Sequence, residues 1–437
     1  MKIRSLMVAA IVLAALVGVL YWSGHRKPEA ETAASASTPP AILKLDPATI
    51  TRVELQKKDA EPLVLAKDSA GNWQITQPRP LRADQSVVTS TVDSLAALNS
   101  ERLVEDKATD LGRYGLTQPT VEADVTIKDK KTQKLLIGDE TPTGNAYFAM
   151  LEGDPRVFTM PGYAKTGIDK SANDLRDKRL LTVSADKISR LELIGKNQAI
   201  EFGRDKDEWQ IVKPEPLRAD SAQVGELVGK LTDARMDLSG SSEDSKKIAS
   251  AFSQATPVAT AKVTDPSGTQ QLQIRKSNDT YYARSSVVDG VYKVDAALGQ
   301  AVDKKLDDFR NKKLFDFGFN DPTKIEIHDG SKAWFFTRSG TDWWENGKKL
   351  DPATMDALVA DLRDLSASKF VDSGFAQPTL AFTVTSDDGK KTEKVSAVKS
   401  GDGFIAKREN EPTLYFVESS TVGALDKAAE GVKPAAK

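Results

Sequence analysis

The chain has 437 residues, 39% of them hydrophobic and 28% charged, so it is long enough for about three globular domains and too well balanced for gross disorder. Its 61 Lys and Arg residues face 63 Asp and Glu residues, and the lack of any basic excess or basic cluster excludes a nucleic-acid partner. The absence of cysteine excludes disulfides, thiolate metal sites and cysteine nucleophiles, and two histidines cannot supply a paired-imidazole zinc site.

The N-terminus has the pattern of a membrane anchor. A short basic tail, residues 1–5, precedes an uninterrupted apolar run over residues 6–22 that ends in Tyr21 and Trp22, which suit a membrane interface. We therefore predict a single transmembrane helix in the inner membrane, with a cytoplasmic N-terminus and the bulk of the chain in the periplasm. A cleaved signal peptide is the alternative, because an Ala-x-Ala site follows at residues 34–36. Residues 23–41 are rich in Ala, Ser, Thr, Pro and Glu and are predicted to form a flexible tether.

A five-residue sequence reveals a repeat. Pro80-Leu81-Arg82-Ala83-Asp84 returns unchanged at residues 216–220, an offset of 216 − 80 = 136 residues. Solenoid repeats have periods of roughly 20–50 residues, so the repeating unit here is predicted to be a whole domain. We predict three tandem modules at residues 42–180, 181–315 and 316–427, the third diverged from the others, followed by a disordered tail at residues 428–437.

The order of elements within a module predicts an α+β fold. In the first module, alternating apolar residues at 50–55, 63–65 and 73–75 predict strands, and an amphipathic helix follows Asp84. Four more strands are expected at 121–127, 134–137, 146–150 and 157–160, and a closing helix around 163–175. The second module repeats this order from residue 188 and the third from residue 323. Each module is therefore predicted to be a mostly antiparallel sheet with two helices.

Three aspartates occupy one equivalent position, directly before the amphipathic helix of each module. Asp84, Asp220 and Asp351 could be interpreted as catalytic, but an Asp at this place is typical of an N-cap, whose carboxylate accepts hydrogen bonds from the first turn of the helix. We interpret all three as structural helix caps.

Tryptophans are the candidate ligand contacts. Trp334, Trp343 and Trp344 concentrate aromatic area in the third module, which makes them the first choice for contacting a glycan, a peptide or a protein partner. The alternative is structural, because Trp73, Trp209 and Trp343 each follow a basic residue at a spacing that would place a cation over the ring.

The sequence contains none of the motifs that would indicate an enzyme. It lacks phosphate-binding, nucleophile-elbow and dinucleotide-binding motifs, so no catalytic, metal-binding or cofactor-binding residue is predicted. A carboxylate-dependent hydrolase remains the enzymatic alternative, and it would need two carboxyl groups converging at about 5–10 Å. Neighbouring acidic residues such as Asp307-Asp308 point apart in either a strand or a helix and do not supply such a pair.

Several short sequences of the first module stand out as landmarks. They are Trp73-Gln74-Ile75, residues 80–84, Tyr114-Gly115-Leu116-Thr117-Gln118-Pro119, Leu136-Ile137-Gly138 and the closing residues 175–178. Together they resemble the landmarks of the bacterial domain-of-unknown-function 4340 family. The resemblance covers most of residues 44–315, and the third module departs from it by lacking the Tyr-Gly-Leu and Ile-Gly sequences. It implies an exported, N-terminally anchored protein, associated in some members with ABC-type transport systems, and it transfers no catalytic residue.

These observations together predict a non-enzymatic protein. We expect a membrane-anchored periplasmic repeat protein that acts as a scaffold or accessory subunit of an envelope or ABC-type transport assembly. Its predicted partners are the inner membrane, through residues 6–22, and another envelope protein, an ABC-type transporter being one candidate. The alternative is a module that binds a glycan or a peptide.

Overall fold

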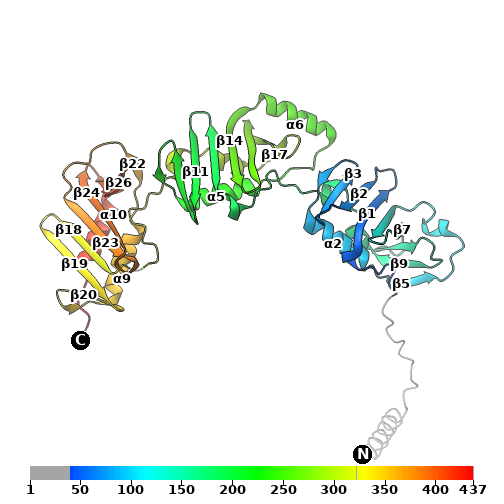
Figure 1. The fold of residues 1–437 in the computed structure, drawn as a ribbon, viewed down its shortest axis with the longest axis horizontal. Helices are drawn as coiled ribbons and strands as arrows, with labels where there is room; N and C mark the ends of the chain where they lie inside the picture. Colours follow the sequence, from blue (N-terminus) through cyan, green and yellow to red (C-terminus); the bar gives the residue numbers. More distant parts are fainter. Residues whose placement is uncertain (1–39, 321, 437) are drawn as a thin grey trace, which may run out of the picture. The chain divides into compact units, whose positions relative to one another are not determined.

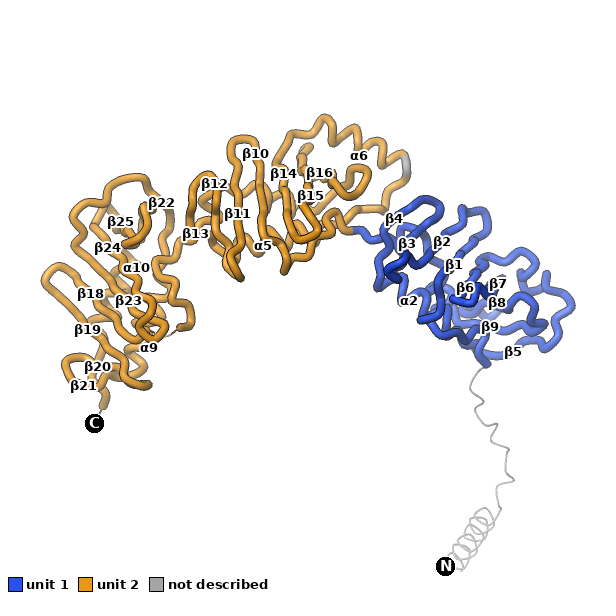
Figure 2. The backbone as a smooth tube through the Cα atoms, viewed as in Figure 1, with its two compact units in different colours: residues 1–178 blue, residues 179–437 orange. Residues whose placement is uncertain are grey.

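The structure is a computed structural model that describes residues 40–320 and 322–436 (Figure 1). The predicted tail (1–5), the predicted transmembrane helix (6–22) and nearly all of the predicted tether (23–41) lie outside the described residues. Within the described part of the chain, no helix is both long and apolar enough to cross a membrane. The chain divides into two compact units at residues 178 and 179 (Figure 2). The first unit holds module 1, and the second holds modules 2 and 3.

Module 1 is built on one antiparallel sheet of nine strands in the order β4-β3-β2-β1-β6-β7-β8-β9-β5. The strands are β1 (Ile50–Lys57), β2 (Leu63–Lys67), β3 (Trp73–Gln77), β4 (Leu81–Arg82), β5 (Arg102–Glu105), β6 (Val121–Ile127), β7 (Thr132–Glu140), β8 (Ala146–Leu151) and β9 (Val157–Pro161). The α-helices are α2 (Gln85–Ala96), α3 (Gly162–Ile168) and α4 (Ala172–Leu175), and short 3₁₀ turns lie at η1 (Pro47–Thr49) and η2 (Leu111–Tyr114).

Module 2 has the same plan with eight strands, in the order β13-β12-β11-β10-β14-β15-β16-β17. The strands are β10 (Arg190–Gly195), β11 (Ala199–Asp205), β12 (Glu208–Lys213), β13 (Leu217–Arg218), β14 (Thr256–Asp265), β15 (Gly268–Ser277), β16 (Thr280–Ser285) and β17 (Tyr292–Val294). Its helices are η3 (Ala185–Lys187), α5 (Ser221–Thr232), α6 (Ser242–Gln254), α7 (Ala296–Val302) and α8 (Leu306–Phe309).

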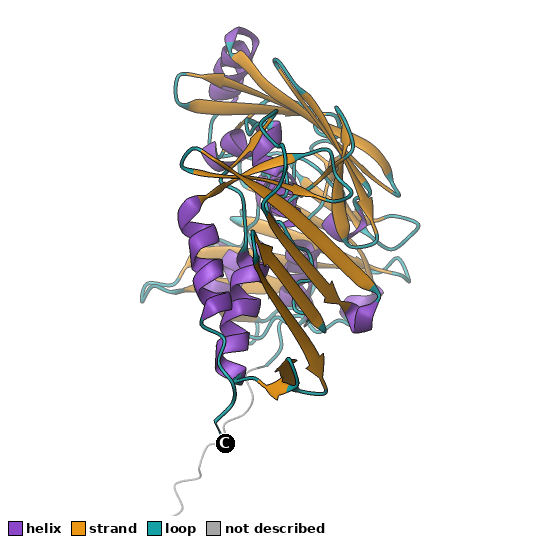
Figure 3. Ribbon diagram, turned by 90° about the vertical axis from the view of Figure 1, so that its left-hand side faces the viewer, coloured by secondary structure: helices purple, strands orange, loops and turns teal. Residues whose placement is uncertain are grey.

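Module 3 returns to nine strands, in the order β21-β20-β19-β18-β23-β24-β25-β26-β22. The strands are β18 (Lys324–Asp329), β19 (Lys332–Ser339), β20 (Asp342–Glu345), β21 (Lys348–Lys349), β22 (Lys369–Val371), β23 (Leu380–Ser386), β24 (Lys391–Ser400), β25 (Gly403–Arg408) and β26 (Leu414–Glu418). The helices are α9 (Pro352–Asp364), η4 (Asp387–Gly389) and α10 (Ser419–Glu430), and in Figure 3 two helices lie along one face of the sheet nearest the viewer.

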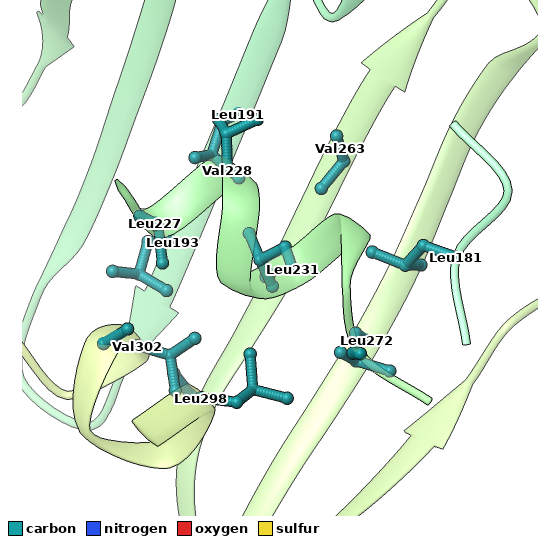
Figure 4. Packing of buried hydrophobic residues seen from close by; sticks show 14 of the residues in the cluster. Leu181, Leu191, Leu193, Leu227, Val228, Leu231, Val263, Leu272, Leu298 and Val302 are labelled. Carbon is teal, nitrogen blue, oxygen red and sulfur yellow. The ribbon is translucent and has the colours of Figure 1, made fainter. Parts of the chain in front are cut away.

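The alternating pattern of the strands explains why the helices that follow the meanders cover one face of each sheet, whereas α6 of module 2 packs Phe252 beside Tyr282 on the opposite face. In module 2, Leu191 and Leu193 of β10 are fully buried and face α5, which contributes Leu227, Val228 and Leu231 to the same core (Figure 4). Each fully buried aliphatic side chain of this kind contributes about 1.5–3 kcal/mol relative to an exposed one. The predicted α+β class and the three modules are therefore confirmed.

Each module consists of two similar halves, each a four-stranded meander followed by a helix. In module 1 the halves are β1–β4 with α2 and β6–β9 with α3, and they meet where β1 pairs antiparallel with β6. The same central pairing joins β10 to β14 and β18 to β23. The repeat visible in the sequence is thus a repeat of a unit that is itself doubled.

Two helical regions differ from the sequence-based prediction. The expected helix over residues 163–175 is two short helices, because α3 ends at Ile168 and Ser171 starts α4 with a capping box to Asp174. Module 2 also contains α6, which was not expected, so the prediction of two helices per module is wrong for modules 1 and 2. Helix α6 has no equivalent in the first module from which the element order was inferred.

The C-terminal segment also differs from the prediction of a disordered tail at residues 428–437. Helix α10 continues through Glu430, and the chain then pairs with the edge of the sheet. The N–H of Asp351 donates to the carbonyl of Lys433 over 2.8 Å, and the N–H of Ala435 donates to the carbonyl of Lys349 over 2.9 Å. Backbone pairing of this kind holds the described part of this segment against module 3.

Candidate functional site

The repeated pentapeptide forms an edge strand and then a helix cap. Its Leu-Arg pair is strand β4 in module 1 and β13 in module 2, and Lys348–Lys349 takes the same place as β21 in module 3. Asp84 follows as the N-cap of α2 and accepts from the N–H groups of Ser86 and Val87 at 3.1 and 3.2 Å. Its pKa lies below the usual value, because the hydrogen bonds from Ser86 and Val87 outweigh the opposing effect of burial.

The other two predicted cap residues occupy the same position. Asp220 caps α5 by accepting from the N–H groups of Ala222 and Gln223 at 3.0 and 3.1 Å. Asp351 caps α9 by accepting from the N–H of Thr354 at 3.2 Å. All three aspartates therefore have a structural function in the helices they start.

The closing segment of each module pairs with the pentapeptide. In module 2 the N–H of Asp220 donates to the carbonyl of Phe309 at 2.8 Å, and the N–H of Asn311 donates to the carbonyl of Arg218 at 2.9 Å. Module 1 makes the equivalent bonds from Asp84 to Leu175 and from Asp177 to Arg82. In module 3 the segment around Lys433 takes this place, which explains how that module closes without the basic sequence that ends the other two.

Arg218 connects this edge of module 2 to module 3. Its guanidinium lies 2.6 Å from the carboxylate of Asp316 and donates two 3.0 Å hydrogen bonds to the carbonyl of Lys313. It also donates to the hydroxyl of Tyr415 at 3.2 Å and lies 3.5 Å from the carboxylate of Glu411. Only 18% of the Arg218 side chain is exposed. Arg218 thus joins the pentapeptide to residues 313–316, which lead into module 3, and to the second half of module 3.

Arg408 completes the cluster from the side of module 3. Its guanidinium contacts Asp316 at 3.2 Å, Glu393 at 3.0 Å and Glu411 at 2.8 Å, and it donates to the carbonyl of Leu314 at 2.9 Å. Asp316 and Glu411 are therefore shared between the two guanidinium groups, and Glu393 binds Arg408 alone, an arrangement that favours fixed geometry over mobile charge. We call this cluster, formed by Arg218, Asp316, Glu393, Arg408, Glu411 and Tyr415, the joint.

The surroundings of Arg218 and Tyr415 raise the pKa of both groups. Burial disfavours the charge on Arg218, but Asp316 and Glu411 outweigh burial and the pKa of Arg218 is raised. Burial also raises the pKa of Tyr415 to about 12, so its hydroxyl stays protonated and donates to Glu411 at 2.7 Å.

A polar cavity of about 420 Å³ adjoins the joint and is lined by Arg218, Asp316, Lys313 and Lys391. Lys391 donates to the carbonyl of Asp316 at 2.7 Å, and a second contact between the modules lies nearby, where the guanidinium of Arg310 stacks 3.5 Å from the ring centroid of Phe370. Positive and negative groups alternate around the cavity. Chemically, the arrangement is suited to holding two modules together.

The three tryptophans predicted to contact a ligand do not share one surface. Trp343 is 5% exposed in the core of module 3, and Trp334 packs at the margin of the same core. Trp344 is the next residue on β20 and faces the opposite side of the sheet, where it pairs with Thr337. Its indole N–H is buried and has no hydrogen-bond partner in the described part of the chain. On that face Phe335 is 46% exposed and its ring meets His328 at 5.3 Å.

The equivalent tryptophans of the other modules lie in cores. Trp73 and Trp209 are 4% and 7% exposed, with Lys67 and Arg204 over their rings at 5.0 and 5.8 Å. These positions agree with the structural alternative for the aligned tryptophans, in which a basic side chain lies over the ring and no ligand is needed.

The Tyr-Gly-Leu and Ile-Gly sequences of module 1 pack against each other. Gly115 ends η2 in the left-handed conformation, with a φ of 67°, and a Cβ atom there would lie 2.4 Å from Asp139. A Cβ atom on Gly138 would lie 2.0 Å from the carbonyl oxygen of Tyr114. The two sequences are thus a close backbone contact that requires glycine on both sides.

Sequence reasoning missed the joint, because its members are far apart in the chain. Arg218 meets Asp316 across 98 residues and Tyr415 across 197 residues. The one available signal was the identity of Arg82 and Arg218 in the repeated pentapeptide, which indicated a role for the arginine beyond the cap.

The fold and the joint define a class of protein built from tandem α+β modules, each a doubled four-stranded meander in which the helix after each meander lies on the same face of the sheet. The chain belongs to the family described as Domain of unknown function (DUF4340), whose sequence model matches residues 73–210 and 209–381. Each match begins near the strand that contains Trp73 or Trp209. The first match therefore combines the later part of module 1 with the opening strands of module 2.

The remaining comparisons add no functional information. No curated protein matches the chain. Among solved structures, the chain is similar to a DnaN sliding clamp (DNA polymerase III subunit beta) from Pseudomonas aeruginosa bound to griselimycin, at 8% identity over 86% of this chain and 93% of the clamp chain. The TM-score is 0.15, so this similarity supports no inference.

Proposed function

We propose that the protein is a non-enzymatic scaffold or accessory subunit of an assembly in the cell envelope, with an ABC-type transport system as one candidate partner. The observation that carries the proposal is the joint. In it, Arg218 of module 2 and Arg408 of module 3 both bind Asp316 and Glu411, so the two modules are connected by ion pairs. A protein that uses a partly buried ionic cluster to hold modules in register is suited to presenting binding surfaces at fixed spacing.

The repeated landmarks of the sequence support a scaffold more than an enzyme. The conspicuous aspartates cap helices, the glycines of module 1 form a backbone contact, and Trp73 and Trp209 fill cores. The aspartates, glycines and tryptophans that stand out in the sequence therefore have structural roles within the modules.

The sheet faces turned away from α2, α5 and α9 are the surfaces that a scaffold would present, and α6 covers only the part of this face over β15–β17 in module 2. The first strand of each module carries a basic residue and a glutamate two positions later, on this face. Arg52 and Glu54 lie 2.6 Å apart, Arg190 and Glu192 also lie 2.6 Å apart, and Lys324 contacts Glu326. A charged face repeated in every module is suited to a polar protein partner.

The apolar run at residues 6–22 supports anchoring in the inner membrane with the modules exported. An alkaline phosphatase fusion after Lys437 tests this topology. An active fusion is expected, and an inactive one would overturn the exported orientation.

Site-specific photocrosslinking in cells tests the scaffold itself. A crosslinker placed at Glu54, Glu192 or Glu326 of the full-length chain is expected to capture a defined envelope protein, and an Arg218→Met variant is expected to capture less of it. Absence of any envelope partner at all three positions would count decisively against the proposal.

A further inference from the structure

The three modules differ at one edge of their sheets. In modules 1 and 3 a ninth strand follows the first long helix: β5 pairs with β9, and β22 pairs with β26. In module 2 the sheet has eight strands, and among the described residues no strand pairs with the outer side of β17. Modules 1 and 3 therefore supply a ninth strand of their own, and the sheet of module 2 lacks it.

A local turn explains why module 2 lacks this strand. The chain after α2 reaches the last strand through a hydrogen bond from the N–H of Glu101 to the carbonyl of Thr159 at 2.7 Å, and the chain after α9 does so from Ser368 to Phe416 at 2.9 Å. At the corresponding place in module 2, the carboxylate of Asp237 accepts from the N–H and hydroxyl of Ser239 at 3.0 and 2.6 Å. This turn competes with strand pairing, and the chain departs into α6.

Lys293 is the residue of β17 whose backbone faces the unpaired outer edge of the module 2 sheet. Lys293 lies two residues before the N-cap of α7, as Thr159 and Phe416 do before the helices that follow their strands. Because both backbone polar groups of a residue in an antiparallel strand point to the same side, the N–H and C=O of Lys293 are placed on the outer edge of β17. The Lys293 side chain is exposed.

A cavity of about 510 Å³ lies along this edge. Its walls include Lys293 and Val294 of β17 on one side and Asp237 on the other, and Leu298 of α7 provides an apolar surface. The cavity therefore offers an open strand edge beside apolar side chains, the combination by which an extended peptide is recognised through β-augmentation.

We propose that the outer edge of β17 binds an extended segment of a partner protein, which adds to module 2 as its ninth strand. The proposal rests on the proposed scaffold function and specifies one kind of partner segment. It commits to an antiparallel strand with an acidic residue opposite Lys293 and an apolar residue opposite Tyr292.

The ninth strands of the other modules supply the argument for this chemistry. The residue opposite Phe158 is Leu103 and the residue opposite Tyr415 is Phe370, so an apolar residue is expected opposite the equivalent Tyr292. The next pairs are Arg102 with Thr159 and Lys369 with Phe416, both with a basic residue on the ninth strand. Module 2 places the basic residue on its own strand, at Lys293, which attracts the carboxylates of Asp237 and Asp244. An acidic residue in the added segment would extend this charge pairing across the strand edge.

Hydrogen exchange of the full-length chain with synthetic peptides tests the proposal. The acidic probe is a peptide with the sequence of residues 100–106 in which glutamate replaces Arg102, and the control probe is the unmodified sequence. The amide of Lys293 is expected to exchange rapidly in the free chain and at least about tenfold more slowly with the acidic probe, with a smaller effect from the control probe.

Two variants and one altered peptide separate backbone pairing from charge. Lys293→Pro removes the outward N–H, a change that sheet edges tolerate. It is expected to abolish binding of a fluorescently labelled acidic probe, measured by anisotropy because this variant has no amide at position 293. Lys293→Ala keeps the backbone edge and is expected to bind both probes without preference. An acidic probe N-methylated at the residue opposite Lys293 removes the donor from the peptide side and is expected not to bind, which tests the pairing without altering the protein.

Four outcomes would overturn the proposal. They are protection of the Lys293 amide in the free chain, no slowing of exchange with any probe, undiminished binding by Lys293→Pro, and protection that rises with protein concentration alone, which would assign the edge to a second copy of the chain. None of these outcomes affects crosslinking of an envelope partner at Glu54, Glu192 or Glu326, so the proposed scaffold function can be judged separately.

Discussion

The guanidinium of Arg218, on an edge strand of module 2, lies 2.6 Å from the carboxylate of Asp316, in the segment that leads into module 3. The contact places the arginine of a repeated pentapeptide at the boundary between two modules. Asp316 also binds Arg408 and, through its N–H, Glu393. The boundary is therefore a built interface within the second compact unit.

We predict that Arg218→Met loosens this boundary. The substitution leaves Asp316 and Glu411 with one guanidinium in place of two, at an expected cost of about 1–3 kcal/mol for a partly buried, charged hydrogen-bond cluster. Hydrogen exchange of the amides at 311–316 measures the effect, and exchange there is expected to accelerate. Arg218→Lys keeps the charge without the bidentate geometry and is expected to give an intermediate rate. Unchanged exchange in Arg218→Met would show that the joint is held by other contacts.

Gly138→Ala is predicted to destabilise module 1 by roughly 2–4 kcal/mol, since its Cβ atom would lie 2.0 Å from the carbonyl oxygen of Tyr114 and the backbone must move. Gly167→Ala in α3 is the matched control, because its Cβ atom would meet only Ser94, at 3.8 Å. That control is expected to be neutral or stabilising by up to about 1 kcal/mol. Urea unfolding of both variants checks the difference, and equal stabilities would contradict the close contact.

Asp84→Ala is predicted to cost about 1 kcal/mol through loss of the cap of α2, whereas Asp84→Asn retains most of the cap. The pKa of Asp84 is depressed in the folded protein, so its ionised form stabilises the fold above the ordinary aspartate pKa, and this contribution is lost as the pH falls through the depressed value. The stability difference between wild type and Asp84→Ala should therefore shrink below about pH 4. A difference that stays constant between pH 7 and pH 3 would refute the charge-assisted cap.

Asp426→Asn is predicted to stabilise module 3 at neutral pH. Burial raises the pKa of Asp426, and the neighbouring Asp329 and Glu430 raise it further. Glu430 lies one helical turn away on α10, a like-charge spacing that costs about 0.2–0.5 kcal/mol.

Because the folded pKa of Asp426 is raised, its contribution to stability is complete at low pH and is lost as the pH rises through that value. The gain from Asp426→Asn should thus appear at pH 7 and vanish near pH 3. Thermal unfolding at the two pH values measures it, with Asp372→Asn at an exposed bend as a control expected to show no gain.

Local patterns were sufficient to predict the modules, most strands and the positions of the caps. Period-two alternation identifies a strand such as β10, and an aspartate before an amphipathic run marks the start of α5. The break between α3 and α4 also had a local signal, because Ser171 and Asp174 form the capping box that starts α4. The apolar spacing across the break nevertheless suggested one helix.

The remaining features depend on contacts that no local pattern carries. The prediction that Trp343 and Trp344 act together overlooked that neighbouring residues of a strand face opposite sides of a sheet. The joint could not be predicted, because Glu393, Arg408 and Glu411 approach Arg218 only after module 3 has folded. The open edge of β17 becomes visible only when the sheets of the three modules are compared.

The closing segment of module 2 has a mechanical consequence. Residues 309–311 form backbone hydrogen bonds with the pentapeptide, and Arg218 grips the chain again at Lys313 and Asp316. Tension arriving from module 3 therefore reaches module 2 along the edge strand, where several bonds bear the load in parallel. A force applied along the chain would have to break these hydrogen bonds and ion pairs before it could separate α8 from the rest of module 2. The same bonds that close the fold of module 2 therefore also resist extension of the connection to module 3.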